Sequence, residues 1–141
     1  MIKIIKYGTD EYYQTVQIRS DILRKPLGLE FTEADFHDEE NQIHAVAMDN
    51  GEIVGCLILA PQKDGSIRMR QVAVLENMQN KGVGEKLVAF FETYAKENKF
   101  NKIILNARKT AVPFYEALGY KVVSDYFIQH TTEHCKMEKQ L

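Results

Sequence analysis

The chain has few cysteines, no long apolar run and no surplus of charge of one sign. Two cysteines occur in 141 residues, Cys56 and Cys135, and neither belongs to a C-x-x-C pair or to a histidine arrangement typical of zinc. This scarcity argues against a disulfide framework and favours a reducing, cytoplasmic location. We also expect no bound metal.

The longest apolar run, residues 53–60, is far too short to cross a bilayer, and no secretory apolar segment opens the chain. We therefore expect no membrane association. Eighteen basic and 20 acidic side chains give a formal charge of −2, so nothing in the composition recommends nucleic acid as a partner. Acidic residues gather between Glu30 and Glu40, where they form either a solvated face or a surface that attracts a cationic amine.

The chain does contain a regular succession of strand-like and helix-like segments. Alternation predicts a strand over residues 2–7, and a helix that begins at Thr9 or Asp10 and ends before Pro26. The apolar positions expected to face inward on this helix are Tyr13, Val16, Ile18 and Ile22 or Leu23. A short second helix is predicted from Thr32 to about Glu40.

Turn signals at Asn50-Gly51 and Asp64-Gly65 then separate three strands of an antiparallel meander. The predicted strands are 43–48, 52–60 and 67–75, followed by a helix over 84–96, a strand over 102–107, a helix over 110–118 and terminal strands over 120–128 and 135–139. The sequence therefore predicts a single α/β domain over residues 1–141. Its mixed central sheet should have about six to seven strands, flanked by about four helices.

A glycine-bearing turn, Gln79-Asn80-Lys81-Gly82-Val83-Gly84, lies between a predicted strand and a predicted helix. The first N–H groups of a helix have no intrahelical partners, and the helix dipole adds partial positive charge there, so the turn predicts an anion site. Lys81 either adds a cation or points into water. The spacing matches neither the dinucleotide fingerprint nor the nucleotide phosphate loop.

A second motif, Phe114-Tyr115-Glu116-Ala117-Leu118-Gly119-Tyr120, lies downstream. The two motifs resemble the Gln/Arg-x-x-Gly-x-Gly/Ala signature and the Phe-Tyr-Glu-x-x-Gly-Phe/Tyr segment of the GCN5-related N-acetyltransferase (GNAT) family. Their order and the length of the chain are similar to those of small stand-alone bacterial members. The resemblance implies a GNAT-like acyl-CoA N-acyltransferase fold.

The resemblance also implies a function. The protein is expected to transfer an acetyl group from acetyl-CoA to a primary amine of an unidentified small molecule or protein, by direct attack. The alternative is a regulatory module that binds an acyl-CoA with little or no catalysis. A homodimer is a further expectation, because terminal strands often leave an edge that pairs.

By the same resemblance, the coenzyme's pyrophosphate would lie on the glycine turn, and its pantetheine arm along the strand before it. Asn106 would either hydrogen-bond the pantetheine amides or cap a turn. The residues assigned to the coenzyme are Val72, Ala73, Val74, Gln79, Asn80, Lys81, Gly82, Val83, Gly84, Glu85, Asn106 and Tyr115.

Direct attack on a thioester needs a neutral amine, a donor for the developing oxyanion and a proton source for the thiolate. The amide of Val72, or one nearby, would face the thioester oxygen. Tyr115 is the leading general acid, and the alternative is a core aromatic beside Phe114. His134 is the candidate base, because small bacterial relatives have a histidine near the C-terminus followed by a methionine, here Met137. A structural or exposed histidine is the alternative.

The acceptor side departs from the family pattern. Many relatives have a glutamate on the strand before the glycine turn, where this chain has Arg70 and Gln71. Arg70 would either grip a carboxylate or phosphate of the acceptor or lie at a surface. Arg24 falls in the family's variable acceptor loop, where it would shape the acceptor pocket or simply belong to a helix end. Arg24 and Arg70 are thus the predicted acceptor-binding residues, and the acceptor itself is not assigned.

Overall fold

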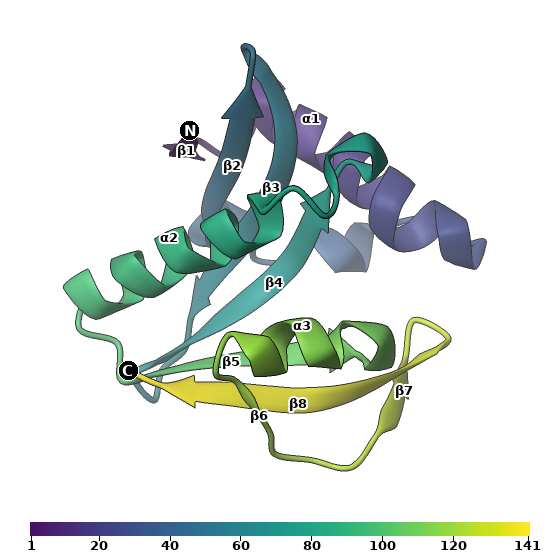
Figure 1. Ribbon diagram of the computed structural model, residues 1–141. Helices are drawn as coiled ribbons and strands as arrows, with labels where there is room; N and C mark the ends of the chain where they lie inside the picture. Colours follow the sequence, from purple (N-terminus) through teal and green to yellow (C-terminus); the bar gives the residue numbers. More distant parts are fainter.

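The structure, a computed structural model, describes residues 1–141 and is built on one eight-stranded sheet (Figure 1). The strands are β1 (Ile2–Ile5), β2 (Ile43–Asp49), β3 (Glu52–Pro61), β4 (Ser66–Val74), β5 (Lys102–Arg108), β6 (Lys121–Val122), β7 (Phe127–Gln129) and β8 (Thr132–Gln140). They follow the order β1-β2-β3-β4-β5-β8-β6, with β7 also paired to β8. The predicted α/β fold and its antiparallel meander, β2-β3-β4, are confirmed.

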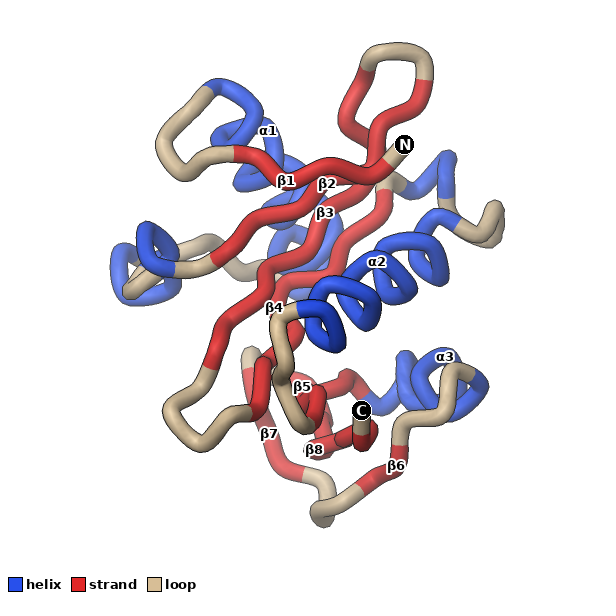
Figure 2. The backbone as a smooth tube through the Cα atoms, turned by 90° about the vertical axis from the view of Figure 1, so that its left-hand side faces the viewer, coloured by secondary structure: helices blue, strands red, loops and turns tan.

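Helices cover both faces of this sheet (Figures 1 and 2). The helix α1 (Asp10–Arg19) continues as a π turn over Ser20–Arg24, α2 is Val83–Glu97 and α3 is Val112–Ala117. Shorter 3-10 turns are Lys25–Leu27, Glu33–Phe36, Glu39–Asn41, Glu76–Met78 and Lys109–Ala111. No helix is long and apolar enough to span a bilayer.

The two faces of the sheet bury separate apolar clusters. On β2, Ala45 and Ala47 belong to the apolar cluster that includes Leu87 of α2, whereas Val46 between them belongs to the cluster that includes Ile18 of α1. Successive side chains of a strand point to opposite faces, so α1 and α2 lie on opposite sides of the sheet. The cluster on the α2 side is the larger one and extends across β5 and β8.

One parallel pair, β4 with β5, joins the two antiparallel parts of the sheet. Their register covers three residues, Ser66 to Arg68 on β4 against Lys102 to Ile104 on β5. Beyond these pairs the two strands separate, as Figure 1 shows. A bulge lies in β4 just past this point, because Gln71 and Val72 stand opposite Leu57 alone. Gln71 has a φ of 54°, and strained, bulged residues of this kind concentrate at functional sites.

Three local predictions were wrong. On α1, Tyr13 is 59% exposed, whereas Tyr12 is buried and donates a hydrogen bond from its hydroxyl to Glu39. Residues 32–40 form two short 3-10 turns rather than one helix, although Thr32 and Asp35 do make the expected capping box. The strand predicted over 120–128 is two short strands, β6 and β7, separated by four residues without ladder pairing.

Candidate active site

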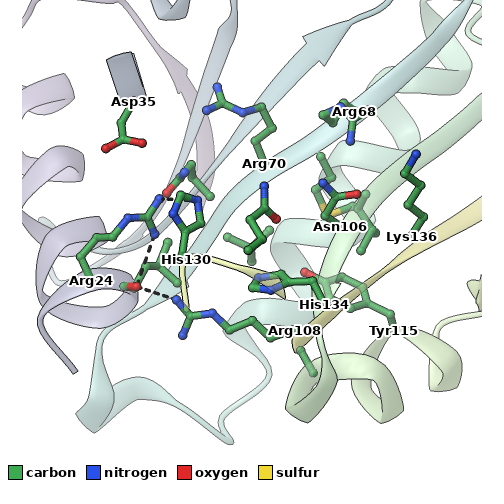
Figure 3. A pocket seen from close by; sticks show the side chains of 17 residues that line it. Arg24, Asp35, Arg68, Arg70, Asn106, Arg108, Tyr115, His130, His134 and Lys136 are labelled. Atoms are coloured by element: carbon green, nitrogen blue, oxygen red, sulfur yellow. Dashed lines mark hydrogen bonds between the residues drawn. The ribbon is translucent and has the colours of Figure 1, made fainter. Parts of the chain in front are cut away.

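A cavity of about 700 Å³ opens where β4 and β5 separate (Figure 3). Its walls come from the end of the first helical segment, the bulged part of β4, the outer half of β5, the helix α3 and the β7–β8 hairpin. Six residues that the sequence predicted for the site line this cavity, and they are Arg24, Arg70, Val72, Asn106, Tyr115 and His134. Residues far apart in the sequence therefore meet in one place.

Two buried amide oxygens in this cavity have no hydrogen-bond partner, Oε1 of Gln71 and Oδ1 of Asn106. A buried polar group without a partner costs about 1–3 kcal/mol, so both are available to a ligand that donates hydrogen bonds. Because β4 has no ladder pairing with β5 after Arg68, that edge can also accept an extended chain. The slot thus suits a long ligand with amide groups, which agrees with the position expected for pantetheine.

The helix α2 begins beside this slot, and no side chain caps its N-terminus. Its N-cap, Gly82, has a φ of 82° and contributes no side-chain cap. A Cβ at Gly84 would lie 3.3 Å from Cζ of Phe114, so this glycine is needed for the contact between α2 and α3. The uncapped N–H groups and the dipole of a 15-residue helix are the features that the predicted anion site requires.

The side chains of the glycine turn do not all face this site. Gln79 donates from Nε2 to the carbonyl of Val74 at 3.0 Å, which ties the turn to the end of β4. Glu85 is exposed, and Oε2 of its carboxylate would lie 3.4 Å from a Cβ at Gly82. Lys81 is also exposed. The backbone of the turn, rather than these side chains, is therefore the feature suited to an anion.

Tyr115 reaches the cavity from α3. It is 8% exposed and packs edge-on against Phe114 and Tyr120, with ring centroids 5.0 and 5.7 Å away. Burial raises the pKa of the phenol to about 12, so it is protonated at neutral pH. Tyr115 is therefore a core aromatic that also lines the cavity, and its role as general acid stays a prediction.

His134, the third residue of β8, is 5% exposed and also lines the cavity. Its Nδ1 lies 3.0 Å from the carbonyl of Thr132. A carbonyl only accepts hydrogen bonds, so this contact places the ring proton on Nδ1 and leaves a lone pair on Nε2. Burial lowers the pKa of His134, the Thr132 carbonyl opposes this shift, and Arg108 and Arg24 lower the pKa further. The imidazole is thus neutral and able to accept a proton.

Both predicted acceptor-side arginines line the cavity but have protein partners. Arg70 donates from Nη1 to Oε1 of Gln42 at 2.6 Å and lies 3.9 Å from Oε2 of Glu39. Arg24 is 3% exposed, contacts the ring of Phe31 and lies 3.2 Å from Nε2 of His130. Arg70 is therefore held toward the protein rather than toward the centre of the cavity.

Sequence reasoning missed Arg108, and a signal for it existed. Side chains two apart on a strand share a face, so Arg108 had to lie beside Asn106 on β5. The ladder pairs Arg108 with His134 on β8. The other titratable lining residues that were not predicted for the site are Asp35, Arg68, His130 and Lys136.

A sheet that opens between two parallel strands, beside an uncapped helix N-terminus, defines this fold as that of the acyl-CoA N-acyltransferases. Residues 14–141 match the family model described as acetyltransferase (GNAT) domain, so the chain belongs to the GNAT family. Its members are acyltransferases, and the predicted enzyme class is confirmed.

Relatives and solved structures agree with this assignment. The chain is 27% identical over 140 residues to YjcF of Bacillus subtilis, described as an uncharacterized N-acetyltransferase, and covers 99% of each protein. Escherichia coli ElaA has the same fold at a TM-score of 0.86 and 16% identity, covering 99% of this chain and 98% of that one. A GNAT family acetyltransferase of Elizabethkingia anophelis with acetyl-CoA bound superposes at a TM-score of 0.79 with 19% identity, covering 100% and 97%.

Proposed function

We propose that the protein transfers an acetyl group from acetyl-CoA to a primary amine by direct attack. The observation that carries this proposal is the open slot between β4 and β5, with the unpartnered oxygens of Gln71 and Asn106 inside it. The backbone of residues 72–74 and Asn106 would hold the pantetheine arm. The N-terminus of α2, from Gly82 to Glu85, would hold the pyrophosphate.

The chain also has groups suited to each proton transfer. Nε2 of His134 would accept a proton from the amine as the new C–N bond forms. The phenol of Tyr115 would donate a proton to the sulfur as the C–S bond breaks. An N–H group at the bulge, that of Val72 or a neighbour, would stabilise the oxyanion. The products are an N-acetyl amide and the free thiol, and no covalent enzyme intermediate is needed.

The alternative of a coenzyme-binding module with little catalysis rests on one observation. No carboxylate stands at Arg70 or Gln71, where many relatives have their glutamate. Release of thiol in the presence of an amine would support the N-acetyltransferase. Tight coenzyme binding without turnover would support the coenzyme-binding module. Cytoplasmic location and a homodimer remain predictions.

Calorimetric titration with acetyl-CoA tests the proposal, with desulfo-CoA and ATP as controls. We expect micromolar binding of acetyl-CoA and much weaker binding of ATP. Gly82→Glu should weaken acetyl-CoA binding at least tenfold, because it places a carboxylate and added bulk at the anion site.

Gly51→Glu is the matched control. Gly51 has a φ of 78°, close to that of Gly82, and lies in the β2–β3 turn with no atom near its missing Cβ. Both variants therefore carry the same backbone strain and the same added charge. Equal coenzyme affinity in the two variants would remove the glycine turn from the binding site.

A further inference from the structure

The charged side chains around the cavity are almost all cationic. One carboxylate, Asp35, faces five cations, which are Arg24, Arg68, Arg70, Arg108 and Lys136 (Figure 3). The whole chain has a formal charge of −2, so this concentration of positive charge is local. A cavity with low-dielectric walls focuses such a field on its contents.

The nearest buried acid does not neutralise this charge. Glu39 accepts two hydrogen bonds from Arg19, at 3.0 and 2.6 Å, and both side chains are fully buried. Arg70 is only a distant third partner, 3.9 Å from the same carboxylate. None of the seven ion pairs of the structure includes Arg24, Arg68, Arg108 or Lys136.

Two of these guanidinium groups are fixed next to each other. Arg24, at the end of the first helical segment, and Arg108, on β5, both donate to the carbonyl of Leu23, at 3.3 and 2.5 Å. Figure 3 shows both side chains turned to this single oxygen. One neutral carbonyl cannot balance two cations. Burial lowers the pKa of Arg24, the charge of Asp35 raises it, and Arg108, Arg19 and Arg70 lower it further.

The contact of Arg24 with His130 points the same way. A guanidinium has only donors, so Nε2 of His130, 3.2 Å from Nη2 of Arg24, must accept and this imidazole is neutral. A neutral His130 therefore does not compensate the positive charge of the two guanidinium groups. The planar donors of two neighbouring arginines suit a carboxylate or a phosphate.

We infer that the acceptor amine of the proposed transfer also carries a carboxylate or phosphate group, which binds at the Arg24–Arg108 pair. This inference rests on the proposed function and names its substrate class. The same field disfavours an ammonium ion, so the acceptor amine is held in the neutral form that attacks the thioester. The amine proton passes to His134, the C–N bond forms, the C–S bond breaks and the sulfur takes the proton of Tyr115. Polyamines and the lysines of basic peptides are excluded as acceptors, because the cationic side chains of the cavity repel them.

Thiol release from acetyl-CoA tests this inference with matched amines. The panel is the standard amino acids, their carboxamides, phosphoethanolamine and spermidine. We expect at least one carboxylate-bearing or phosphate-bearing amine to exceed its uncharged analogue, the carboxamide or ethanolamine, by tenfold or more in kcat/KM. The amino acids and phosphoethanolamine distinguish the two kinds of anion.

Variants locate the effect. Arg108→Gln should raise KM for the preferred anionic amine at least tenfold while the affinity for acetyl-CoA, measured by calorimetry, stays unchanged. Arg108→Lys retains the positive charge but lacks the planar pair of donors. Its KM for the anionic amine should lie between that of the wild type and that of Arg108→Gln. Lys109→Gln removes a neighbouring charge that pairs with Glu133 at the surface, and it should leave KM unchanged.

The two proposals fail in different ways. If acetyl-CoA binds and spermidine or the carboxamides are the better acceptors, or no anionic amine is acetylated, the inference is overturned and the coenzyme site stands. If acetyl-CoA does not bind to the unaltered protein, the proposed function is overturned together with the inference. An equal loss of activity toward anionic and neutral amines in Arg108→Gln would also overturn the inference, because it would assign Arg108 to structure.

Discussion

His134 and Tyr115 approach the cavity from opposite faces of the sheet. On β8, Cys135 and Met137 share one face of the strand and belong to the apolar cluster on the α2 side. His134 precedes Cys135, and because successive side chains alternate, it points to the other face. Tyr115 belongs to the α2-side cluster itself. The two side chains can meet because β4 and β5 are apart, and the same opening therefore serves the ligand and its catalytic groups.

The neutral state of His134 leads to a pH prediction. Burial and the charges of Arg108 and Arg24 hold its pKa below the usual 6.5, against the opposing effect of Thr132. As a base it must be unprotonated, so its contribution to kcat/KM is complete at neutral pH and declines only below its lowered pKa. His134→Gln should lower kcat/KM by about 10²–10⁴ at pH 7.

The measurement is the ratio of kcat/KM for wild type and His134→Gln across pH 5–9. The ionisation of the acceptor amine cancels in this ratio. A ratio that is flat above neutrality and falls in acid supports the assignment. A ratio near 1 at neutral pH, or a ratio that rises as the pH falls, would contradict it.

Tyr115→Phe removes the proposed proton donor and retains the ring. We expect kcat to fall by about 10² or more, with acetyl-CoA affinity unchanged, in a thiol-release assay. Tyr120→Phe is the control, because this neighbouring buried phenol donates to Glu92 outside the cavity and should affect stability rather than kcat. Similar kcat values for Tyr115→Phe and the wild type would leave Tyr115 with a packing role only.

At the scale of the element, periodicity located the first helix and the buried position of Ile18, but not the polar part of the buried face. The prediction chose apolar Tyr13, whereas the face that is buried includes Tyr12, Thr15 and Arg19. Arg19 and Tyr12 can be buried because Glu39, from a 3-10 turn 20 residues after Arg19, accepts hydrogen bonds from both, whereas the Thr15 hydroxyl donates to the carbonyl of Tyr12. A hydropathy pattern does not encode a partner so distant in sequence. By contrast, the glycine turn and Tyr115 lie within local motifs, and Asn106 lies near the end of a strand, so the family resemblance could assign all three from the sequence.

Glu39→Gln should destabilise the fold by about 3 kcal/mol in urea unfolding, because it leaves Arg19 buried without a counter-charge. Asp21→Asn, in an exposed pair with Lys25, should cost much less, because solvent screens that pair. An equal cost for the two substitutions would contradict the importance of the buried pair.

The same pair predicts the pH dependence of stability. Burial raises the pKa of Glu39, but the hydrogen bond and charge of Arg19, with Tyr12 and Arg70, lower it more, so the net shift is downward. A carboxyl group whose pKa is lower in the folded than in the unfolded state stabilises the fold at any pH above its unfolded pKa. This stabilisation is lost as the pH falls through the pKa of the folded state. The difference in free energy of unfolding between the wild type and Glu39→Gln should therefore become smaller at acidic pH.

At the scale of the whole molecule, the order of strands and helices follows from local sequence patterns, whereas the opening in the sheet was implied only by the family resemblance. Turn residues and alternation specify where strands begin and end. They do not specify that β4 and β5 pair over three residues and then part, because this depends on backbone geometry. The bulge gave no signal either, since its positive φ falls on Gln71 rather than on a glycine.

The short β4–β5 ladder has a consequence for how the chain could be divided. Backbone hydrogen bonds barely cross from one part of the sheet to the other, yet the apolar cluster joins Leu57 and Leu59 on one side with Leu105 and Met137 on the other. A break at Lys99, in the turn after α2, would leave each fragment with its own strand ladders. The two fragments would recognise each other mainly through side-chain contacts, with only a short ladder and a few hydrogen bonds between them. The protein is thus suited to reassembly from separately made halves, with coenzyme binding as the sign that they have joined.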